Sequence, residues 1–239
     1  MYRIHNIFHR IYRKSALLQR IHIGLYNYRQ SKKTKKAINT IRKYGYEALA
    51  SFHQCMTENG YSYSLAFGTL LGAVREHDFI PHDNDIDLAM WIDDYRPEML
   101  NCLAEYGFKL KHTFSIEGDM IGKEDTFDYK GVQLDVFYFY KDKEGITYCC
   151  DFVHFKDCSS WNDSIKKHGG LLPRKLFLPY STDFQTIDFN GIKTSIPSNY
   201  HEILSFRYGM DYMIPKPGWR PNTQYIIEQP ELLGVYKEY

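Results

Sequence analysis

The sequence predicts an α+β fold in which a sheet is flanked by helices and preceded by an N-terminal helical extension. Three observations support it. Apolar residues in roughly the first sixty positions recur at intervals of three and four, as on one face of a helix. Several strand-like segments follow, the most apolar covering residues 132–140. A further strand opens with aspartates at alternate positions, Asp83, Asp85 and Asp87.

We divide the chain into a basic amphipathic extension, residues 1–36, and a main domain, residues 37–239. Of the 30 Lys and Arg, twelve lie in residues 1–43, which hold no Asp or Glu, and so 18 face 29 acidic residues in the rest. Two interpretations of residues 1–29 remain open. The helix docks on an anionic membrane surface, or it packs on the body with a solvated basic face.

The four lysines of residues 32–36 predict an exposed joint, followed by a second helix over about residues 37–59 that Gly60 ends. This second helix carries apolar residues for the core. None of its residues suggests chemistry, and we expect it to be scaffold.

The stretch over residues 65–91 predicts a strand, a Gly68-Thr69 turn that opens a short helix, a loop through Pro81 and a second strand. Side chains alternate along a strand, so Asp85 and Asp87 share a face, and Asp83 joins them if the strand begins early. Clustered carboxylates suit Mg²⁺ or Mn²⁺. Gly68 permits close backbone approach, and the N–H groups of a helix start suit a phosphate. These features indicate an enzyme that moves a phosphoryl group.

After residue 91, the sequence pattern predicts a helix, then several strands, then a last helix. Asp94 is the expected cap of a helix that Gly107 ends, and Asn190-Gly191 is a hairpin turn signal. A last helix is expected to open at Ser198 or Asn199. The expected strands are 108–115, a piece near 120–122, 132–140 and 146–153, with 159–185 irregular.

Asp135 lies in the apolar segment V-Q-L-D-V-F-Y-F-Y. A carboxylate there must be paired, hydrogen-bonded or metal-bound. We therefore expect Asp135 to be a third active-site carboxylate, the alternative being a structural Asp at a strand end.

Five cysteines form no disulfide framework, which favours a reducing compartment, and we expect a cytoplasmic protein. No apolar run is long enough for a membrane span, and the N-terminus does not resemble a signal peptide. Cys149, Cys150, His154 and Cys158 match no standard zinc spacing, and whether they bind zinc stays open.

The motif over residues 68–87 resembles the signature of the LicD/fukutin family. It comprises G-T-L-L-G-A-V-R at 68–75, F-I-P at 79–81 and D-N-D-I-D at 83–87. The segment R-Y-G-M-D-Y at 207–212 is similar to the closing element of that family. Family members often carry Trp at the position of His82 and Asp at that of Asn84. Along a strand these two positions point to the opposite face from Asp85 and Asp87, so the departures should not remove the metal site.

The resemblance implies a nucleotidyltransferase-like mixed sheet and a transferase that uses Mg²⁺ or Mn²⁺. It implies transfer of phosphocholine from CDP-choline, or of a phospho-alditol from a CDP-alditol, to a sugar hydroxyl of a cell-surface glycan or glycolipid, as in lipopolysaccharide or capsule biosynthesis. It implies no nucleic-acid partner. Peripheral contact with the anionic inner membrane face is expected if the N-terminal helix docks on a membrane rather than on the body.

By the same resemblance Asp85, Asp87 and Asp135 are the metal ligands and catalytic carboxylates, with Asp135 a candidate general base. The residues expected to bind substrate are Gly68, Thr69, Arg75 and Asp83. Arg75 stabilises charge on the transferred group or on CMP, or instead forms a salt bridge to the acidic loop. A nucleotidyltransferase that releases pyrophosphate, and a non-catalytic binding module, are the competing functions.

Overall fold

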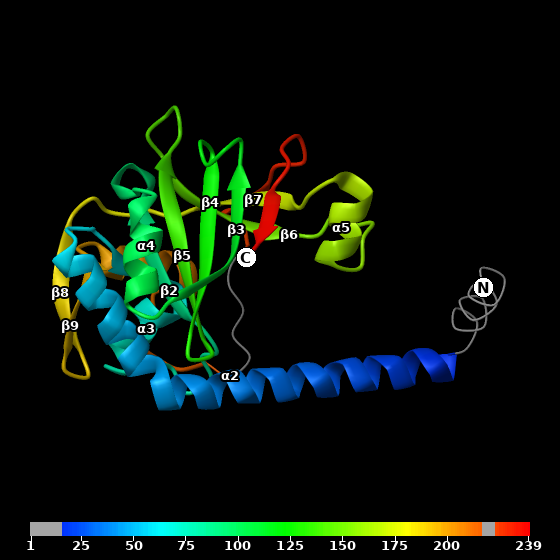
Figure 1. The fold of residues 1–239 in the computed structure, drawn as a ribbon, viewed down its shortest axis with the longest axis horizontal. Helices are drawn as coiled ribbons and strands as arrows, with labels where there is room; N and C mark the ends of the chain where they lie inside the picture. Colours follow the sequence, from blue (N-terminus) through cyan, green and yellow to red (C-terminus); the bar gives the residue numbers. More distant parts are fainter. Residues whose placement is uncertain (1–15, 217–222) are drawn as a thin grey trace.

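The computed structural model describes residues 16–216 and 223–239, and it confirms the α+β fold (Figure 1). In chain order the elements are α2 (Ala16–Glu58), β1 (Ser64–Leu65), α3 (Phe67–Arg75), β2 (Ile86–Trp91), the 3₁₀ helix η1 (Ile92–Asp94), α4 (Glu98–Glu105), β3 (Lys109–Ile116), β4 (Gly122–Tyr129), β5 (Val132–Lys141), β6 (Thr147–Val153), α5 (Trp161–His168), β7 (Leu172–Phe177), β8 (Phe184–Phe189), β9 (Ile192–Pro197), α6 (Tyr200–Tyr208), β10 (Ile226–Glu228) and β11 (Val235–Glu238).

The helix α2 is continuous over 43 residues, and the joint expected at residues 32–36 is wrong. The four lysines are exposed there, as expected, but straight-chain lysines favour helix and do not interrupt it. The C-terminal half buries Ile41, Leu49 and Phe52, whereas the N-terminal half extends past the sheet (Figure 1).

Residues 1–15 lie outside the described residues, so the amphipathic interpretation of 1–29 and the boundary at residue 36 stay predictions. Among the described residues, no helix combines the length and hydrophobicity that a membrane span requires.

Nine strands of the described residues form one sheet, in the order β10-β7-β6-β5-β4-β3-β11, with β2 parallel to β5 and β1 antiparallel to β2. The remaining pairs are antiparallel, so the sheet is mixed. β5 lies between β2 and β4, and its side chains are buried at most positions on both faces, which accounts for its apolar sequence.

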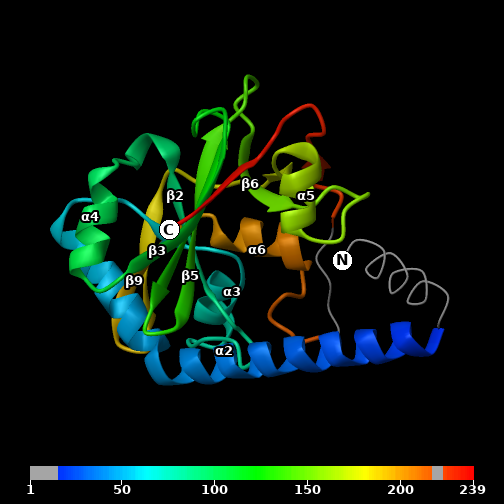
Figure 2. The same cartoon turned by 45° about the vertical axis from the view of Figure 1, so that its right-hand side comes forward.

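The sheet curls until its two ends approach each other (Figure 2). β6 pairs with β5 only at Tyr140 and Lys141 and then passes over β4, where a Cβ on Gly122 would lie 2.7 Å from the Cys150 Sγ. Leu171, just before β7, forms a bridge with Gly234, just before β11. Strands from both ends therefore enclose a common space.

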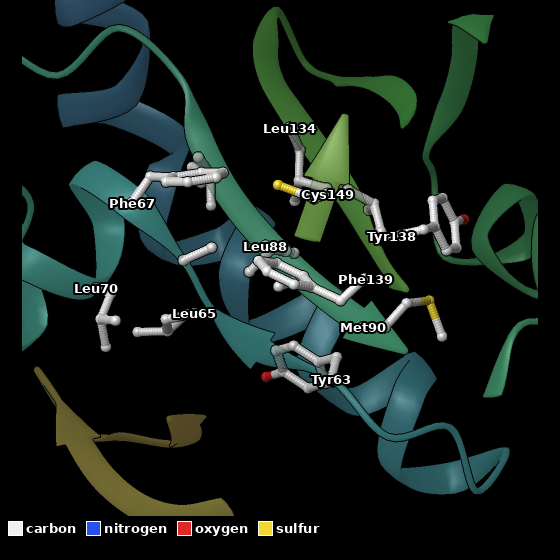
Figure 3. Packing of buried hydrophobic residues seen from close by; sticks show 14 of the residues in the cluster. Tyr63, Leu65, Phe67, Leu70, Leu88, Met90, Leu134, Tyr138, Phe139 and Cys149 are labelled. Atoms are coloured by element: carbon white, nitrogen blue, oxygen red, sulfur yellow. The ribbon is translucent and has the colours of Figure 1, made fainter. Parts of the chain in front are cut away.

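The short helix α3 packs on this sheet. A Cβ on Gly72 would lie 2.5 Å from the Asp78 carbonyl oxygen, so glycine allows the following loop to cross the helix closely. Leu70 and Leu65 join the core with Leu88 of β2 and Phe139 of β5 (Figure 3). This packing fixes the start of α3 against the start of β2.

Several local expectations are confirmed and others are wrong. Asn190 and Gly191 have φ of 51° and 88°, as the hairpin turn between β8 and β9 requires. The helix expected from Asp94 begins instead at Glu98, because residues 92–94 form η1. The segment 159–185 is not irregular. Ser160 caps α5 by accepting a hydrogen bond from the Asp163 N–H, and β7 follows.

Candidate active site

Three carboxylates meet where β2 and β5 run side by side. Asp87 of β2 and Asp135 of β5 are register partners on parallel strands, so their side chains share one face. Asp85 lies just before β2, and one oxygen from each of Asp85, Asp87 and Asp135 lies within 4.8 Å of the others. The structure thus brings together the three aspartates that the sequence singled out.

Asp87 is oriented by the first turn of α3. The Gly68 N–H donates to Asp87 Oδ2 at 3.0 Å, and the Asp87 N–H donates to Thr69 Oγ1 at 2.9 Å. The Gly68 N–H, expected to face a phosphate, is therefore engaged with a carboxylate. Thr69 is 1% exposed, and its hydroxyl holds the backbone of β2 in place through the hydrogen bond from the Asp87 N–H.

The backbone before Gly68 is strained. Phe67 has a φ of 42°, which is rare for an aromatic residue. Its ring is held in an edge-on contact with Phe137, with centroids 4.7 Å apart, and under the Arg207 guanidinium at 4.3 Å. These contacts hold the unusual turn that presents Gly68 to Asp87.

Asp135 is buried but hydrogen-bonded, which meets the requirement set by its apolar strand. Thr126 Oγ1 donates to Oδ1 at 2.6 Å, and Gln133 Nε2 donates to Oδ2 at 2.8 Å. Burial raises the pKa of Asp135 to about 6, while these two hydrogen bonds lower it. The carboxylate is thus ionised near neutral pH.

The other carboxylates also hold their protons more tightly than free aspartates. Burial raises the pKa of Asp85, and burial together with the charges of Asp85 and Asp135 raises the pKa of Asp87 well above its ordinary value. A divalent cation would relieve this repulsion, and an all-oxygen donor set suits Mg²⁺ or Mn²⁺. The three residues therefore fit such an ion.

Asp83 lies apart from the three. Its Oδ2 accepts the Ile80 N–H at 3.1 Å, and burial raises its pKa to about 7. A Cβ on Gly68 would lie 3.5 Å from Asp83 Oδ1 and 3.4 Å from Asp87 Oδ2. Gly68 thus separates two carboxylates, and each of them faces a different pocket.

The first of these, the Arg75 pocket, has a volume of about 450 Å³ and lies on the Asp83 side. Arg75 and Lys216 supply positive charge, and Tyr208 and Tyr212 supply aromatic surface. Arg75 forms a salt bridge with its neighbour Glu76 and also donates to the Tyr212 carbonyl at 3.3 Å. Of the two alternatives stated for Arg75, a salt bridge to the acidic loop is not formed among the described residues, because Arg75 pairs with Glu76, and the substrate-binding role stays a prediction.

The second, the Glu124 pocket, has a volume of about 250 Å³ and lies on the Asp87 side, inside the curl of the sheet. Its polar residues Glu124, Asp151 and Arg207 were not expected from the sequence. Glu124 was missed because only a piece near residues 120–122 was predicted as strand there, whereas β4 begins at Gly122 and runs to Tyr129. Arg207 lies in the R-Y-G-M-D-Y motif, a signal that could have identified it.

The zinc question has a partial answer. Among the described residues, Cys158 lies close enough to Asp157 and His168 to form a possible metal-binding group, and this group does not include Cys149, Cys150 or His154. Asp157 is exposed and already accepts hydrogen bonds from Lys167 and His168. Cys149 and Cys150 are buried in β6.

Known proteins resemble this chain in the region of the site. The nucleotidyltransferase domain described as LicD/FKTN/FKRP matches residues 60–199. The ribitol-5-phosphate transferase FKTN of Mus musculus is 28% identical over 210 residues, which cover 82% of this chain and 41% of the relative. The human ribitol 5-phosphate transferase FKRP is 27% identical over 183 residues, which cover 74% of this chain and 31% of the relative.

A shorter match involves the lipopolysaccharide cholinephosphotransferase LicD of Haemophilus influenzae. It is 49% identical over 45 residues, or 19% of this chain and 17% of the relative. The matched residues cover less than half the length of each of these curated relatives.

Proposed function

The chain belongs to the LicD/FKTN/FKRP nucleotidyltransferase family, and we propose that it transfers a phospho-substituted group from a CDP-linked donor to a sugar hydroxyl of a glycan or glycolipid. Phosphocholine from CDP-choline is the group we propose first. The observation that carries the proposal is the meeting of three carboxylates on a parallel strand pair beside two pockets.

Asp85, Asp87 and Asp135 would hold Mg²⁺ or Mn²⁺. A bound divalent ion would neutralise charge on the donor diphosphate and on the CMP that leaves. Asp87 is held for this role by the Gly68 N–H, and Thr69 acts by positioning β2 rather than by touching substrate. Support for the metal comes from the shared donor geometry and the raised pKa values.

The Arg75 pocket suits the CDP portion of the donor. Arg75 and Lys216 would attract the phosphates, and aromatic residues would cover the nucleoside. Asp83 would keep its loop in place by accepting the Ile80 N–H, and Gly68 would leave room for the substrate because it has no side chain between the two pockets.

Asp135 would act as general base toward the acceptor hydroxyl. It is ionised near neutral pH, and Thr126 and Gln133 fix its orientation. The proton moves from the acceptor oxygen to a carboxylate oxygen of Asp135 while that acceptor oxygen bonds to the phosphorus of the transferred group. The bond between this phosphorus and the bridging oxygen breaks, and CMP leaves with that oxygen.

Ribitol phosphate is the second candidate for the transferred group. The observation that favours it is the long match to FKTN, which covers 82% of the chain, against 19% for LicD. We propose a cytoplasmic protein that touches the anionic inner membrane face through its basic N-terminal segment, where a glycolipid acceptor would be available.

The test is to incubate the protein with CDP-choline or CDP-ribitol, Mg²⁺ or Mn²⁺, and a panel of sugars, and to identify the products. CMP release that depends on metal and sugar supports the proposal. Pyrophosphate release from CTP in the presence of a phosphorylated co-substrate would instead support a nucleotidyltransferase. Absence of both CMP and pyrophosphate with every donor would overturn the proposed transferase activity.

A further inference from the structure

The Glu124 pocket is built on two neighbouring rows of side chains on one face of the sheet. Across β3, β4 and β5, Phe114 is opposite Glu124, and Glu124 is opposite Phe137. The next row on that face carries Thr126, Asp135 and, on β2, Asp87. Rows two residues apart are separated by about 7 Å along the strands.

Aromatic rings form the walls of this pocket. Phe137 lies edge-on to Phe67 on one side. On the other side Phe114 is stacked on Phe152 with centroids 4.9 Å apart, and Trp161 meets Phe114 edge-on at 5.2 Å. Trp161 is 39% exposed, so its indole lies at the mouth of the pocket.

The charged side chains of the Glu124 pocket differ in whether they have a partner. Asp151 is held by Arg174 through two hydrogen bonds. Arg207 donates to the Tyr225 hydroxyl, and its positive charge favours the ionised form of Asp87. Among the described residues, none donates a hydrogen bond to Glu124 or forms a salt bridge with it. Burial, together with the charges of Asp135 and Asp151, raises the pKa of Glu124 well above its ordinary value. A cation bound beside Glu124 would favour its ionised form.

We propose that the Glu124 pocket receives the quaternary ammonium end of the transferred group, so that the donor substituent is choline rather than a polyol; this rests on the proposed function. Aromatic faces and a carboxylate attract a quaternary ammonium, which has no hydrogen to donate. A polyol needs several hydrogen-bond partners, and the Asp151 carboxylate is already held by Arg174.

The dimensions agree with this assignment. The pocket volume of about 250 Å³ lies below the range of drug-sized sites, about 300–1,000 Å³, and so suits a small head group. With the phosphate at the row of Asp87 and Asp135, the two-carbon linker of choline points the ammonium toward the adjacent row of Glu124. The cytidine then extends the opposite way, into the Arg75 pocket.

The test measures donor affinity by calorimetry with Mg²⁺ and no acceptor, using CDP-choline and CDP-ribitol. Glu124→Gln keeps the size of the side chain and removes its charge. We expect it to weaken CDP-choline binding about 10-fold or more and to leave CDP-ribitol binding unchanged. Glu144→Gln, the same change in an exposed turn, should affect neither donor.

Trp161 supplies a second variant, at a position that is 39% exposed. Trp161→Leu should weaken CDP-choline binding, and Trp161→Phe should restore most of it because a ring remains. Melting curves of every variant serve as the folding control.

Two results would overturn the pocket assignment. One is Glu124→Gln binding CDP-choline as well as the parent protein does. The other is a parent protein that binds CDP-ribitol and releases CMP from it but does not bind CDP-choline, in which case the proposed transferase activity survives. If the parent protein binds neither donor and releases no CMP, the proposed function itself fails.

Discussion

Asp87 holds its position through contacts from two elements. Its carboxylate accepts the Gly68 N–H, its own N–H donates to Thr69, and its register partner is Asp135. A side chain fixed at both backbone and carboxylate loses little entropy when it binds a ligand. The geometry of the site therefore depends on this residue more than on Asp85, which precedes the strand.

Replacing Asp87 by Asn should abolish metal binding and leave the fold intact. The amide oxygen of Asn still accepts the Gly68 N–H, but it carries no charge for a divalent ion. We expect turnover to fall by at least about 100-fold, since a catalytic metal contributes several kcal/mol. Calorimetry with Mn²⁺ and thermal melting measure the two effects separately.

The control for this variant is Asp93→Asn, the same chemical change at an exposed position. It should bind Mn²⁺ as the parent protein does. An Asp87→Asn protein with near-normal turnover would remove the carboxylates from the mechanism, whichever donor is used.

Asp135→Asn should separate proton transfer from donor binding. If Asp135 is the base, kcat should fall by roughly 10²–10⁴-fold while donor affinity stays close to normal. If donor affinity falls as far as in Asp85→Asn, then Asp135 is a metal ligand first.

The pH profile gives a second measurement of the same residue. The pKa of Asp135 is raised to about 6, so the ionised base is present above that pH and is lost as the pH falls through it. Activity should therefore decline on the acid side, with an apparent pKa at or below about 6 because a bound metal lowers it. The part of the decline that comes from Asp135 should be absent from the residual activity of Asp135→Asn, while protonation of Asp85 and Asp87, whose pKa values are also raised, would leave a decline of its own.

At the scale of elements, the two glycines of α3 have different tasks. Gly72 lets the loop after the helix cross it closely, with the Asp78 carbonyl only 2.5 Å from where a Cβ would stand. Gly68 meets only ordinary contacts, at 3.4 Å and beyond, but these are with the carboxylates of Asp87 and Asp83. One glycine therefore serves packing and the other serves the site.

Gly72→Ala should destabilise the protein by about 1–3 kcal/mol, because the obstacle is backbone and cannot rotate away. Gly68→Ala should keep or slightly raise stability, since alanine is the better helix former, while turnover falls. Urea unfolding and CMP release measure the two variants in parallel. Equal stability of both proteins would show that the loop crossing at Gly72 can relax.

At the scale of the whole molecule, the curl of the sheet produces the second pocket. β6 and β7 leave the end of β5, and the bridge between Leu171 and Gly234 draws them toward β11 and β3. Residues from six strands thereby line one cavity beside Asp87. A flat sheet would leave Glu124 and Asp87 on an open surface.

Removal of residues 1–29 should leave the main domain folded. The residues that anchor α2 in the core, Ile41, Leu49, Phe52 and Met56, all lie beyond the deletion. If the segment binds membranes, the full chain should co-sediment with anionic vesicles at low salt and dissociate at high salt, and the truncated chain should not. Loss of folding on truncation would favour a packing role for the segment.

Sequence alone determined the parts of this protein that depend on local pattern. Asp85 and Asp87 were recognised from their alternation, and Asp135 from the cost of a carboxylate in an apolar strand. The hairpin turn at Asn190-Gly191 followed from backbone conformations that few residues adopt. Each inference uses neighbours within one segment, where steric rules act directly.

Tertiary structure decided what depends on residues far apart in the chain. The pairing of Glu124 with Phe137 and Phe114 follows from strand register, which no local pattern specifies. The Gly68 N–H faces Asp87 rather than solvent because α3 packs on β2. Pockets form between elements that are distant in the chain, and so their lining residues could be identified only from the curled sheet of the tertiary structure.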